Sequence, residues 1–201
     1  MFILFTGGAC SGSVWYVSVA DGNDSNPGTP SLPFLTIQKA VDTASNGDTV
    51  LVENGTYFED VNVDKDGLTL KSLESTGATI DGTSYAIELT GNGLSVENFY
   101  IENSTYGIVI SGDQTEDITI SSNWFSDISN TAIYFHWDAD VDGCTVTIDD
   151  NLIFSSGNGI YMEDSMGLLQ DVDINIIDNL IDGPSDGIRF NYLYAGSLEI
   201  S

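Results

Sequence analysis

The amino-acid sequence predicts an all-β protein: a parallel β-helix wound from a single chain, with a short capping helix ahead of its first coil. The first observation is a phrase that recurs every 25 to 28 residues and ends in the same residue type, at Asn98, Asn123, Asn151 and Asn179. The second is a strand-like phrase that keeps the same step and begins with isoleucine, at Ile108, Ile133, Ile160 and Ile188. A period of this length indicates one supersecondary unit stacked on itself.

The third observation is that each repeat holds only short apolar segments, separated by glycine and polar turns, and no helical pattern. Parallel pairing with the next coil is then the economical way to satisfy the backbone hydrogen-bonding groups. We further expect the four recurring asparagines to stack as a structural ladder of side-chain amides along the axis.

The chain divides into three stretches. Residues 1–14 look like the end of a secretory segment, which predicts a secreted or cell-surface protein, and Cys10 after small residues fits a lipoprotein anchor as an alternative. Residues 15–48 hold a strand, a turn-rich loop and the capping helix. Residues 49–201 form the β-helix coils, and their last strand phrase stops in mid-coil, which predicts a truncated C-terminus and a monomer or part of a longer chain.

The capping helix is predicted over residues 36–44. Apolar residues recur there at helical spacing, namely Ile37, Ala40, Val41 and Ala44. Thr36 can cap its start, and Asn46 with Gly47 supplies a left-handed stop.

The composition limits the classes of partner. Among 201 residues, 31 are acidic and 4 are basic, which gives a formal net charge of -27. Such a surface repels phosphate backbones, so we expect no nucleic-acid partner. Two causes of the acidity stay open, adaptation to salty surroundings and carboxylates that hold Ca²⁺. No stretch approaches the roughly 20 apolar residues of a membrane span, and two cysteines exclude a disulfide framework.

Several segments near the N-terminus resemble one known family. They are Tyr16-Val-Ser, the loop from Gly22 to Thr29, Pro33 to Ile37 and Gly47 to Tyr57. Together they are similar to the N-terminal cap and first coil of the pectate-lyase-like superfamily. The resemblance implies a right-handed coil with three sheets, secretion and, in many members, work on polysaccharides. It implies no single activity, because this superfamily includes lyases, hydrolases, epimerases, adhesins and surface proteins without catalytic activity.

One outer face of the coils carries the candidate site. In the isoleucine phrase the flanking apolar residues face inward, so the middle residue faces outward. This predicts an outward row of Glu88, Val109, Tyr134, Tyr161 and Arg189. The next outward position predicts a second row of Thr90, Ser111, His136, Glu163 and Asn191.

The loops that follow this strand lengthen from coil to coil and are rich in carboxylates. Insertions in a solenoid gather on one face, often the binding face. The candidate ligands for Ca²⁺ are Asp138, Asp140, Asp142, Glu163 and Asp164.

Three functions compete at this face. In the first, it processes a polysaccharide or cell-surface glycan that Tyr134, Tyr161, Trp137 and Glu163 bind. The resemblance to lyases implies that Arg189 is the base. A hydrolase would instead use a pair of carboxylates drawn from Asp138, Asp140 and Glu163. His136 could serve as an acid or a base. The candidate catalytic residues are therefore Arg189, His136 and Asp138. In the second, the same face binds glycan without catalysis, and in the third the chain is a structural, adhesin-like segment of a larger surface protein.

Overall fold

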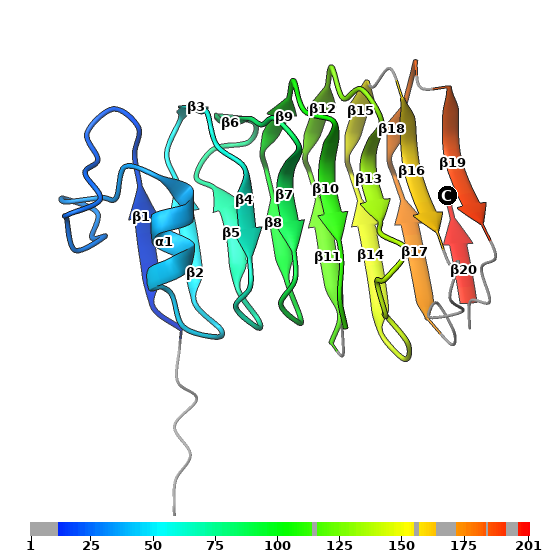
Figure 1. Ribbon diagram of the computed structural model, residues 1–201, viewed down its shortest axis with the longest axis horizontal. Helices are drawn as coiled ribbons and strands as arrows, with labels where there is room; N and C mark the ends of the chain where they lie inside the picture. Colours follow the sequence, from blue (N-terminus) through cyan, green and yellow to red (C-terminus); the bar gives the residue numbers. More distant parts are fainter. Residues whose placement is uncertain (1–11, 114–115, 155–156, 164–171, 184, 192–196) are drawn as a thin grey trace, which may run out of the picture.

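The computed structural model describes residues 12–113, 116–154, 157–163, 172–183, 185–191 and 197–201. These residues form a right-handed parallel β-solenoid with three sheets and one short helix, as the sequence and the family resemblance predict. The coils stack along the long axis of the molecule, with the helix at the end where the chain enters (Figure 1). The described strands pair in parallel with the strands of the neighbouring coils, so these coils follow the same path.

Sheet I is the longest, with eight strands in the described part of the chain. They are β1 (Val14–Val17), β2 (Thr49–Val52), β5 (Thr69–Ser72), β8 (Ser95–Glu97), β11 (Ile118–Ser121), β14 (Thr145–Asp149), β17 (Asp173–Ile177) and β20 (Ser197–Ile200).

Sheet II follows the corner after sheet III and carries the predicted site. Its six described strands are β4 (Val61–Val63), β7 (Tyr85–Leu89), β10 (Tyr106–Ile110), β13 (Thr131–Phe135), β16 (Asn158–Glu163) and β19 (Asp186–Asn191). Sheet III has short strands, and the six described ones are β3 (Gly55–Tyr57), β6 (Ala78–Asp81), β9 (Tyr100–Glu102), β12 (Trp124–Ser126), β15 (Leu152–Phe154) and β18 (Leu180–Ile181).

The inside of the solenoid is filled by columns of like residues. One inward column of sheet II holds isoleucines that are fully buried, namely Ile87, Ile108, Ile133 and Ile160. Parallel register places each one over the next. Because a branched side chain packs well on a pleated surface, this repetition of isoleucine favours strands stacked in register.

The asparagine ladder runs along the tight turn between sheets I and III. Asn123 donates through Nδ2 to Oδ1 of Asn151 at 3.1 Å, and Asn151 does the same to Asn179 at 3.0 Å. Oδ1 of Asn151 also accepts the backbone N–H of Asn123, and Oδ1 of Asn179 accepts the backbone N–H of Asn151. Asn123 and Asn151 are buried. The predicted ladder therefore holds for these three residues.

The prediction that Asn98 joins this ladder was wrong. The backbone N–H of Phe99, not of Asn98, donates to Oδ1 of Asn123, at 3.0 Å, so Phe99 occupies the ladder position of its coil. Asn98 lies one place earlier, with a left-handed φ of 68°. The same corner position holds Ser122, Asp150 and Asp178 in the later coils, all with positive φ. Asn98 fits there because asparagine tolerates this conformation better than most residues.

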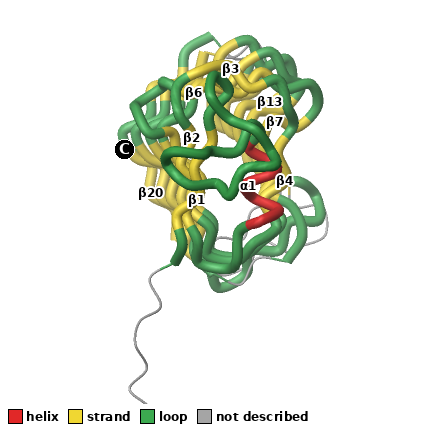
Figure 2. Tube along the Cα trace, turned by 90° about the vertical axis from the view of Figure 1, so that its left-hand side faces the viewer, coloured by secondary structure: helices red, strands yellow, loops and turns green. Residues whose placement is uncertain are grey.

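Helix α1 (Ile37–Thr43) lies at the N-terminal end of the solenoid and packs against β1, β2 and β4. The segment between β1 and α1 crosses in front of the same end (Figure 2). Thr36 is the N-cap, as predicted, and accepts the backbone N–H of Lys39. The helix ends earlier than predicted: Ala44 is an extended C-cap, and Gly47, with φ of 79°, lies beyond it in the turn that leads to β2.

The ladder predicts a contrast between two asparagines. Asn151→Ala removes an amide whose Oδ1 accepts two hydrogen bonds from Asn123, and we expect a loss of about 2–4 kcal/mol in the free energy of unfolding. Asn98→Gly keeps the left-handed corner, and we expect a change within about 0.5 kcal/mol. Urea unfolding followed by circular dichroism measures both, and equal losses would contradict the placement of Asn98 outside the ladder.

Candidate functional site

Strand register builds the outer face of sheet II. Val109 pairs with Glu88 on one side and Tyr134 on the other, Tyr134 pairs with Tyr161, and Tyr161 pairs with Arg189. This is the first outward row predicted from the repeats. On the side of the capping helix the row continues to Asn62 of β4, which pairs with Glu88.

Aromatic rings from successive coils lie side by side along this row, and we call this line of rings the file. The ring centroids of Tyr85 and Tyr106 are 5.4 Å apart, those of Tyr106 and Tyr134 are 5.0 Å apart, and those of Tyr134 and Tyr161 are 5.6 Å apart. The last two pairs are stacked, with interplanar angles of 23° and 25°. The guanidinium of Arg189 lies 5.0 Å from the ring centroid of Tyr161. We call these four tyrosines and Arg189 the tyrosine face.

Tyr85 and Tyr106 were missed at the sequence level. They begin β7 and β10 and pair directly in register, so the shared position of tyrosine at the two strand starts was the available signal. In the coil of Tyr106 the residue of the outward row is Val109, which is buried but lies outside the apolar core cluster. Because valine is small, Tyr106 can extend the file where the row itself offers no ring.

Tyr134 is the most enclosed member of the file, with 7% of its surface exposed. Its hydroxyl donates to Oε2 of Glu163 at 2.8 Å. Burial first, and then this bond and the nearby carboxylate, raise the pKa of Tyr134 well above its ordinary value of 10.0. The phenol therefore stays neutral and acts as a hydrogen-bond donor.

His136 pairs with Asp138 rather than with Glu163, its neighbour in the second predicted row. Nδ1 of His136 lies 2.5 Å from Oδ1 of Asp138, and its ring meets Tyr134 edge-on at 5.8 Å between centroids. This contact leaves Nε2 as the second ring nitrogen for another partner. The ring of Trp137, which is 47% exposed, lies 5.2 Å from the imidazole. The structure thus places His136, Trp137 and Asp138 at the edge of the tyrosine face.

Arg189 is held at two points. Its guanidinium covers Tyr161, and Nη1 lies 3.5 Å from Oδ2 of Asp186. Arginine keeps its positive charge at any ordinary pH. The arrangement suits attraction of an electron-rich group, and the role of Arg189 as a catalytic base stays a prediction.

The carboxylates predicted to hold Ca²⁺ do not converge in the described chain. Asp140 accepts the backbone N–H of Asp142, at 3.1 Å, within the loop, and it forms a parallel bridge with Asp113 of the previous coil. Glu163 bonds Tyr134 instead. No group of three or more His, Cys, Asp or Glu side chains suited to a metal ion occurs among the described residues, and Asp164 lies outside them. Calcium binding stays a prediction.

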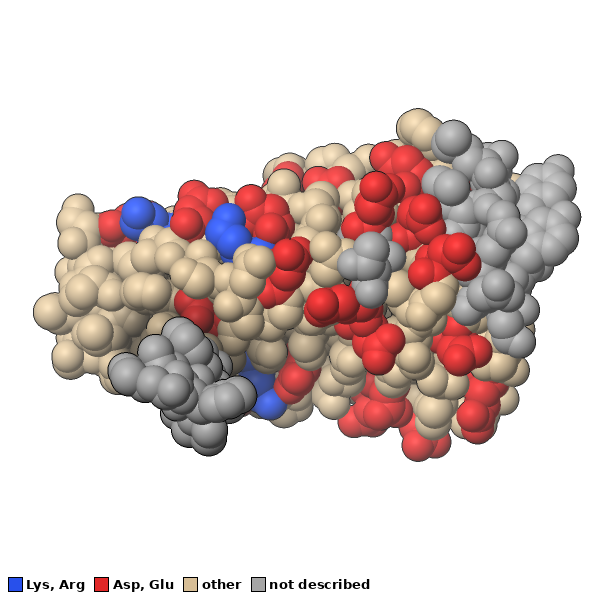
Figure 3. Space-filling model, turned by 90° about the horizontal axis from the view of Figure 1, so that it is seen from below, with Lys and Arg blue, Asp and Glu red and all other residues tan. Residues whose placement is uncertain are grey.

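On the surface that Figure 3 shows, acidic side chains outnumber basic ones and are densest toward the later coils, whereas the basic side chains visible in this view lie toward the helix end. The described residues contain no helix long and apolar enough to cross a membrane.

The sequence profile of one protein family matches residues 20–199 of this chain. The chain therefore belongs to the DUF1565 family, which is described as proteins of unknown function. A relative from Bacillus subtilis (strain 168), described as uncharacterized protein YwoF, is 30% identical over 144 residues. That match covers 61% of this chain and 30% of the relative. The chain thus spans less than a third of that curated relative.

Two solved structures share the fold. An alginate lyase from Paenibacillus sp. str. FPU-7 superposes with a TM-score of 0.56 at 19% identity, covering 77% of this chain and 55% of the lyase. A rhamnogalacturonan lyase superposes with a TM-score of 0.53 at 13% identity, covering 94% of this chain and 63% of that protein. At these identities the likeness shows the parallel β-helix fold and does not assign an activity.

The neutral phenol of Tyr134 predicts an alkaline loss of stability. Because its pKa is raised in the folded state, its contribution is complete below the unfolded pKa of about 10 and is lost as pH rises above that value. Tyr134→Phe should be about 0.5–1.5 kcal/mol less stable than the wild type at pH 7, since it loses the hydrogen bond to Glu163. This difference in the free energy of unfolding should become smaller above pH 10, where the wild type alone loses the contribution of Tyr134. Melting temperatures from pH 7 to pH 12 measure this effect.

Tyr57 also loses its contribution to stability at high pH, because burial raises its pKa to about 12. This loss is the same in the wild type and in Tyr134→Phe, so it cancels in the comparison. Parallel melting curves for the wild type and Tyr134→Phe across the range would contradict the assigned environment of Tyr134.

Proposed function

We propose that this protein binds a polysaccharide along the outer face of sheet II. The observation that carries the proposal is the tyrosine face, a file of four rings with a cation at its end. It crosses β7, β10, β13, β16 and β19. Stacked strands lie about 4.8 Å apart, so the file extends for about 20 Å along the axis. An elongated ligand with repeated apolar faces fits this shape.

The chemistry of the file suits sugar rings. Tyrosine offers a flat apolar face for stacking and a hydroxyl for hydrogen bonding. Tyr85, Tyr106 and Tyr161 are partly exposed, and Trp137 offers a further exposed ring beside His136. Both superposed proteins are named as polysaccharide lyases, which supports a carbohydrate ligand for a chain with the same fold.

Cleavage of the bound glycan is the second candidate function, and the contact between His136 and Asp138 favours it. A carboxylate that orients an imidazole fixes its tautomer and leaves Nε2 to accept or donate a proton. This pair lies beside Tyr134, where a bound sugar would pass. In this proposal His136 is the acid or base, and Asp138 positions it.

The binding proposal predicts a loss of affinity when a ring of the file is removed. Tyr161→Ala takes away a stacking surface and the support of Arg189, and we expect about tenfold weaker binding to the responsive polysaccharide. Tyr161→Phe keeps the ring and should bind within about threefold of the wild type. Affinity electrophoresis against a panel of neutral and uronate polysaccharides measures both changes.

Sheet III provides a matched control. Its outer face carries a separate aromatic file, in which Trp124 lies 5.5 Å from Tyr100 and 5.8 Å from Phe154 between ring centroids. Trp124→Ala disturbs an aromatic stack of the same kind on another face, and it should leave affinity unchanged. Equal losses in Trp124→Ala and Tyr161→Ala would mean that the tyrosines only stabilise the sheet, in favour of the structural, adhesin-like alternative.

The cleavage proposal predicts a separation of binding from turnover. His136→Ala should retain glycan binding within about threefold and lose at least about 100-fold in the rate of cleavage. Size-exclusion analysis of the polymer, with assays for new reducing ends and unsaturated ends, distinguishes hydrolysis from elimination. If the wild type leaves every bound polymer intact, the protein binds without catalysis.

Calcium binding is a separate proposal that the carboxylate-rich loop after β13 motivates. Addition of Ca²⁺ to chelator-treated protein should raise the melting temperature, because an ion that binds only the folded state stabilises it. Asp140→Asn together with Asp142→Asn should reduce that shift. A melting temperature that does not respond to millimolar Ca²⁺ would remove this proposal and leave the binding proposal intact.

A further inference from the structure

A pocket lies at the helix end of the outer face of sheet II. Its volume is about 160 Å³, and its lining residues come from α1, β4, β7 and the segments that precede the two strands: Gln38, Asp60, Val61, Asn62, Ser84, Tyr85 and Glu88. Tyr85 is also the first ring of the tyrosine face. The pocket therefore continues the proposed glycan path toward α1.

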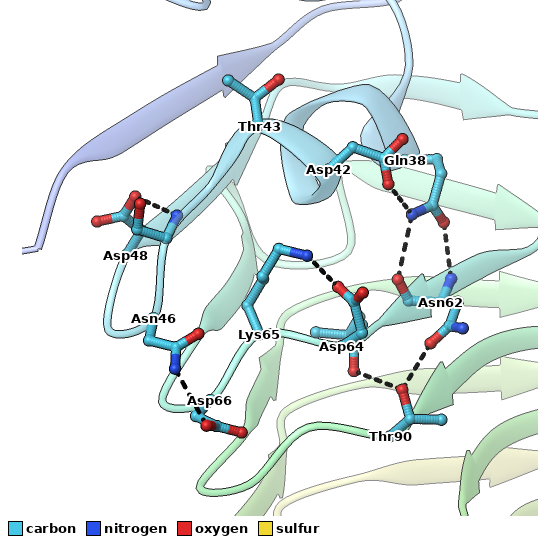
Figure 4. A network of polar contacts seen from close by, with 12 residues as sticks. Gln38, Asp42, Thr43, Asn46, Asp48, Asn62, Asp64, Lys65, Asp66 and Thr90 are labelled. Atoms are coloured by element: carbon cyan, nitrogen blue, oxygen red, sulfur yellow. Dashed lines mark hydrogen bonds and ion pairs between the residues drawn. The ribbon is translucent and has the colours of Figure 1, made fainter.

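Gln38 gives this pocket a fixed wall. Strand β4 is the edge of sheet II, and the Gln38 carboxamide pairs with it as a neighbouring strand would. Oε1 accepts the backbone N–H of Asn62 at 2.8 Å, and Nε2 donates to the carbonyl oxygen of Asn62 at 3.2 Å. Nε2 also donates to Asp42 at 2.9 Å, so both ends of the carboxamide are bonded (Figure 4). The wall is thus preorganised before any ligand binds.

Asn62 and Glu88 place a donor and an acceptor side by side in the pocket. They pair directly in the parallel register of β4 and β7. Oδ1 of Asn62 accepts from Thr90 at 2.9 Å, and Oε1 of Glu88 accepts from Ser111 at 3.0 Å. These bonds orient the two side chains and leave Nδ2 of Asn62 and Oε2 of Glu88 with no further partner in the described chain. A neighbouring amide donor and carboxylate acceptor match the hydroxyl groups on adjacent carbons of a sugar.

The charge of the pocket restricts what it can bind. Asp60 and Glu88 both line it, and Asp60 is held by hydrogen bonds from Thr83 and Ser84. The described lining contains no Lys, Arg or His. A carboxylate on the ligand would therefore meet two carboxylates without a compensating cation, and like charges at contact distance repel.

We propose that this pocket binds one uncharged, hydroxyl-bearing sugar unit of the polymer and rejects a uronate unit. Tyr85 supplies the ring at its apolar side, Asn62 and Glu88 hydrogen-bond the hydroxyls, and Asp60 with Glu88 excludes a carboxylate. The inference rests on the proposed function, because the unit belongs to the glycan on the tyrosine face.

Two oligosaccharides of equal length test it by isothermal titration calorimetry at low and at moderate ionic strength. One is built only of neutral hexose units and the other only of uronate units. The wild type should bind the neutral oligosaccharide at least about tenfold more tightly at low salt, and the preference should shrink as salt screens the repulsion. Glu88→Gln keeps an oxygen for Ser111 but removes the charge, so it should reduce the preference to about threefold or less. Asn62→Ala should weaken binding of the neutral ligand about fivefold.

Glu102→Gln is the matched control. Glu102 lies on the outer face of sheet III and, like Glu88, is partly buried, so the variant makes the same change in net charge away from the pocket. It should leave the preference unchanged. Equal effects of Glu88→Gln and Glu102→Gln would overturn the pocket assignment, and tighter binding of the uronate ligand by the wild type would overturn the ligand class.

The test also separates this inference from the proposed function. Binding that depends on Tyr161 but not on Asn62 or Glu88 would overturn the pocket alone. Binding of neither oligosaccharide, together with none across the polysaccharide panel, would overturn both.

Discussion

Parallel hydrogen bonding between successive coils is the constraint on which the rest of the structure depends. Each short strand can satisfy its backbone only by pairing with the same strand of the next coil, as in β10, β13 and β16. The pairing fixes the register, and the register turns every repeat position into a column. Isoleucine and other apolar side chains then fill the inside, and asparagine side chains hydrogen-bond along the turn between sheets I and III. Loss of register would displace every column at once.

The same constraint builds the candidate site. Outward positions at one strand height become a surface row, so tyrosines in successive coils meet at stacking distance. Burial of Tyr134 keeps its hydroxyl protonated and bonded to Glu163, which joins two adjacent coils. At the helix end the row changes from rings to the amide and carboxylate of Asn62 and Glu88. One face thus combines an apolar path with a polar pocket.

Sequence alone predicts the columns well because the repeats display them directly. The fold, the row from Glu88 to Arg189 and the N-cap Thr36 all follow from periodicity and from the family resemblance. The error at Asn98 has a physical reason: its phrase is one residue shorter than the phrase that ends at Asn123, so alignment by residue type shifts the register by one. Hydrogen-bond partners depend on side-chain rotamers, which periodicity does not encode, so the contact of His136 with Asp138 and the pocket at Gln38 required the structure.

The central claim is that a glycan lies along the tyrosine face, and a crystal structure of the protein with a bound oligosaccharide tests it most directly. The account predicts sugar rings in contact with Tyr106 and Tyr161, with the chain directed along the solenoid axis toward α1. An oligosaccharide bound instead on the outer face of sheet III, over Trp124, with the tyrosine face empty, would contradict the account.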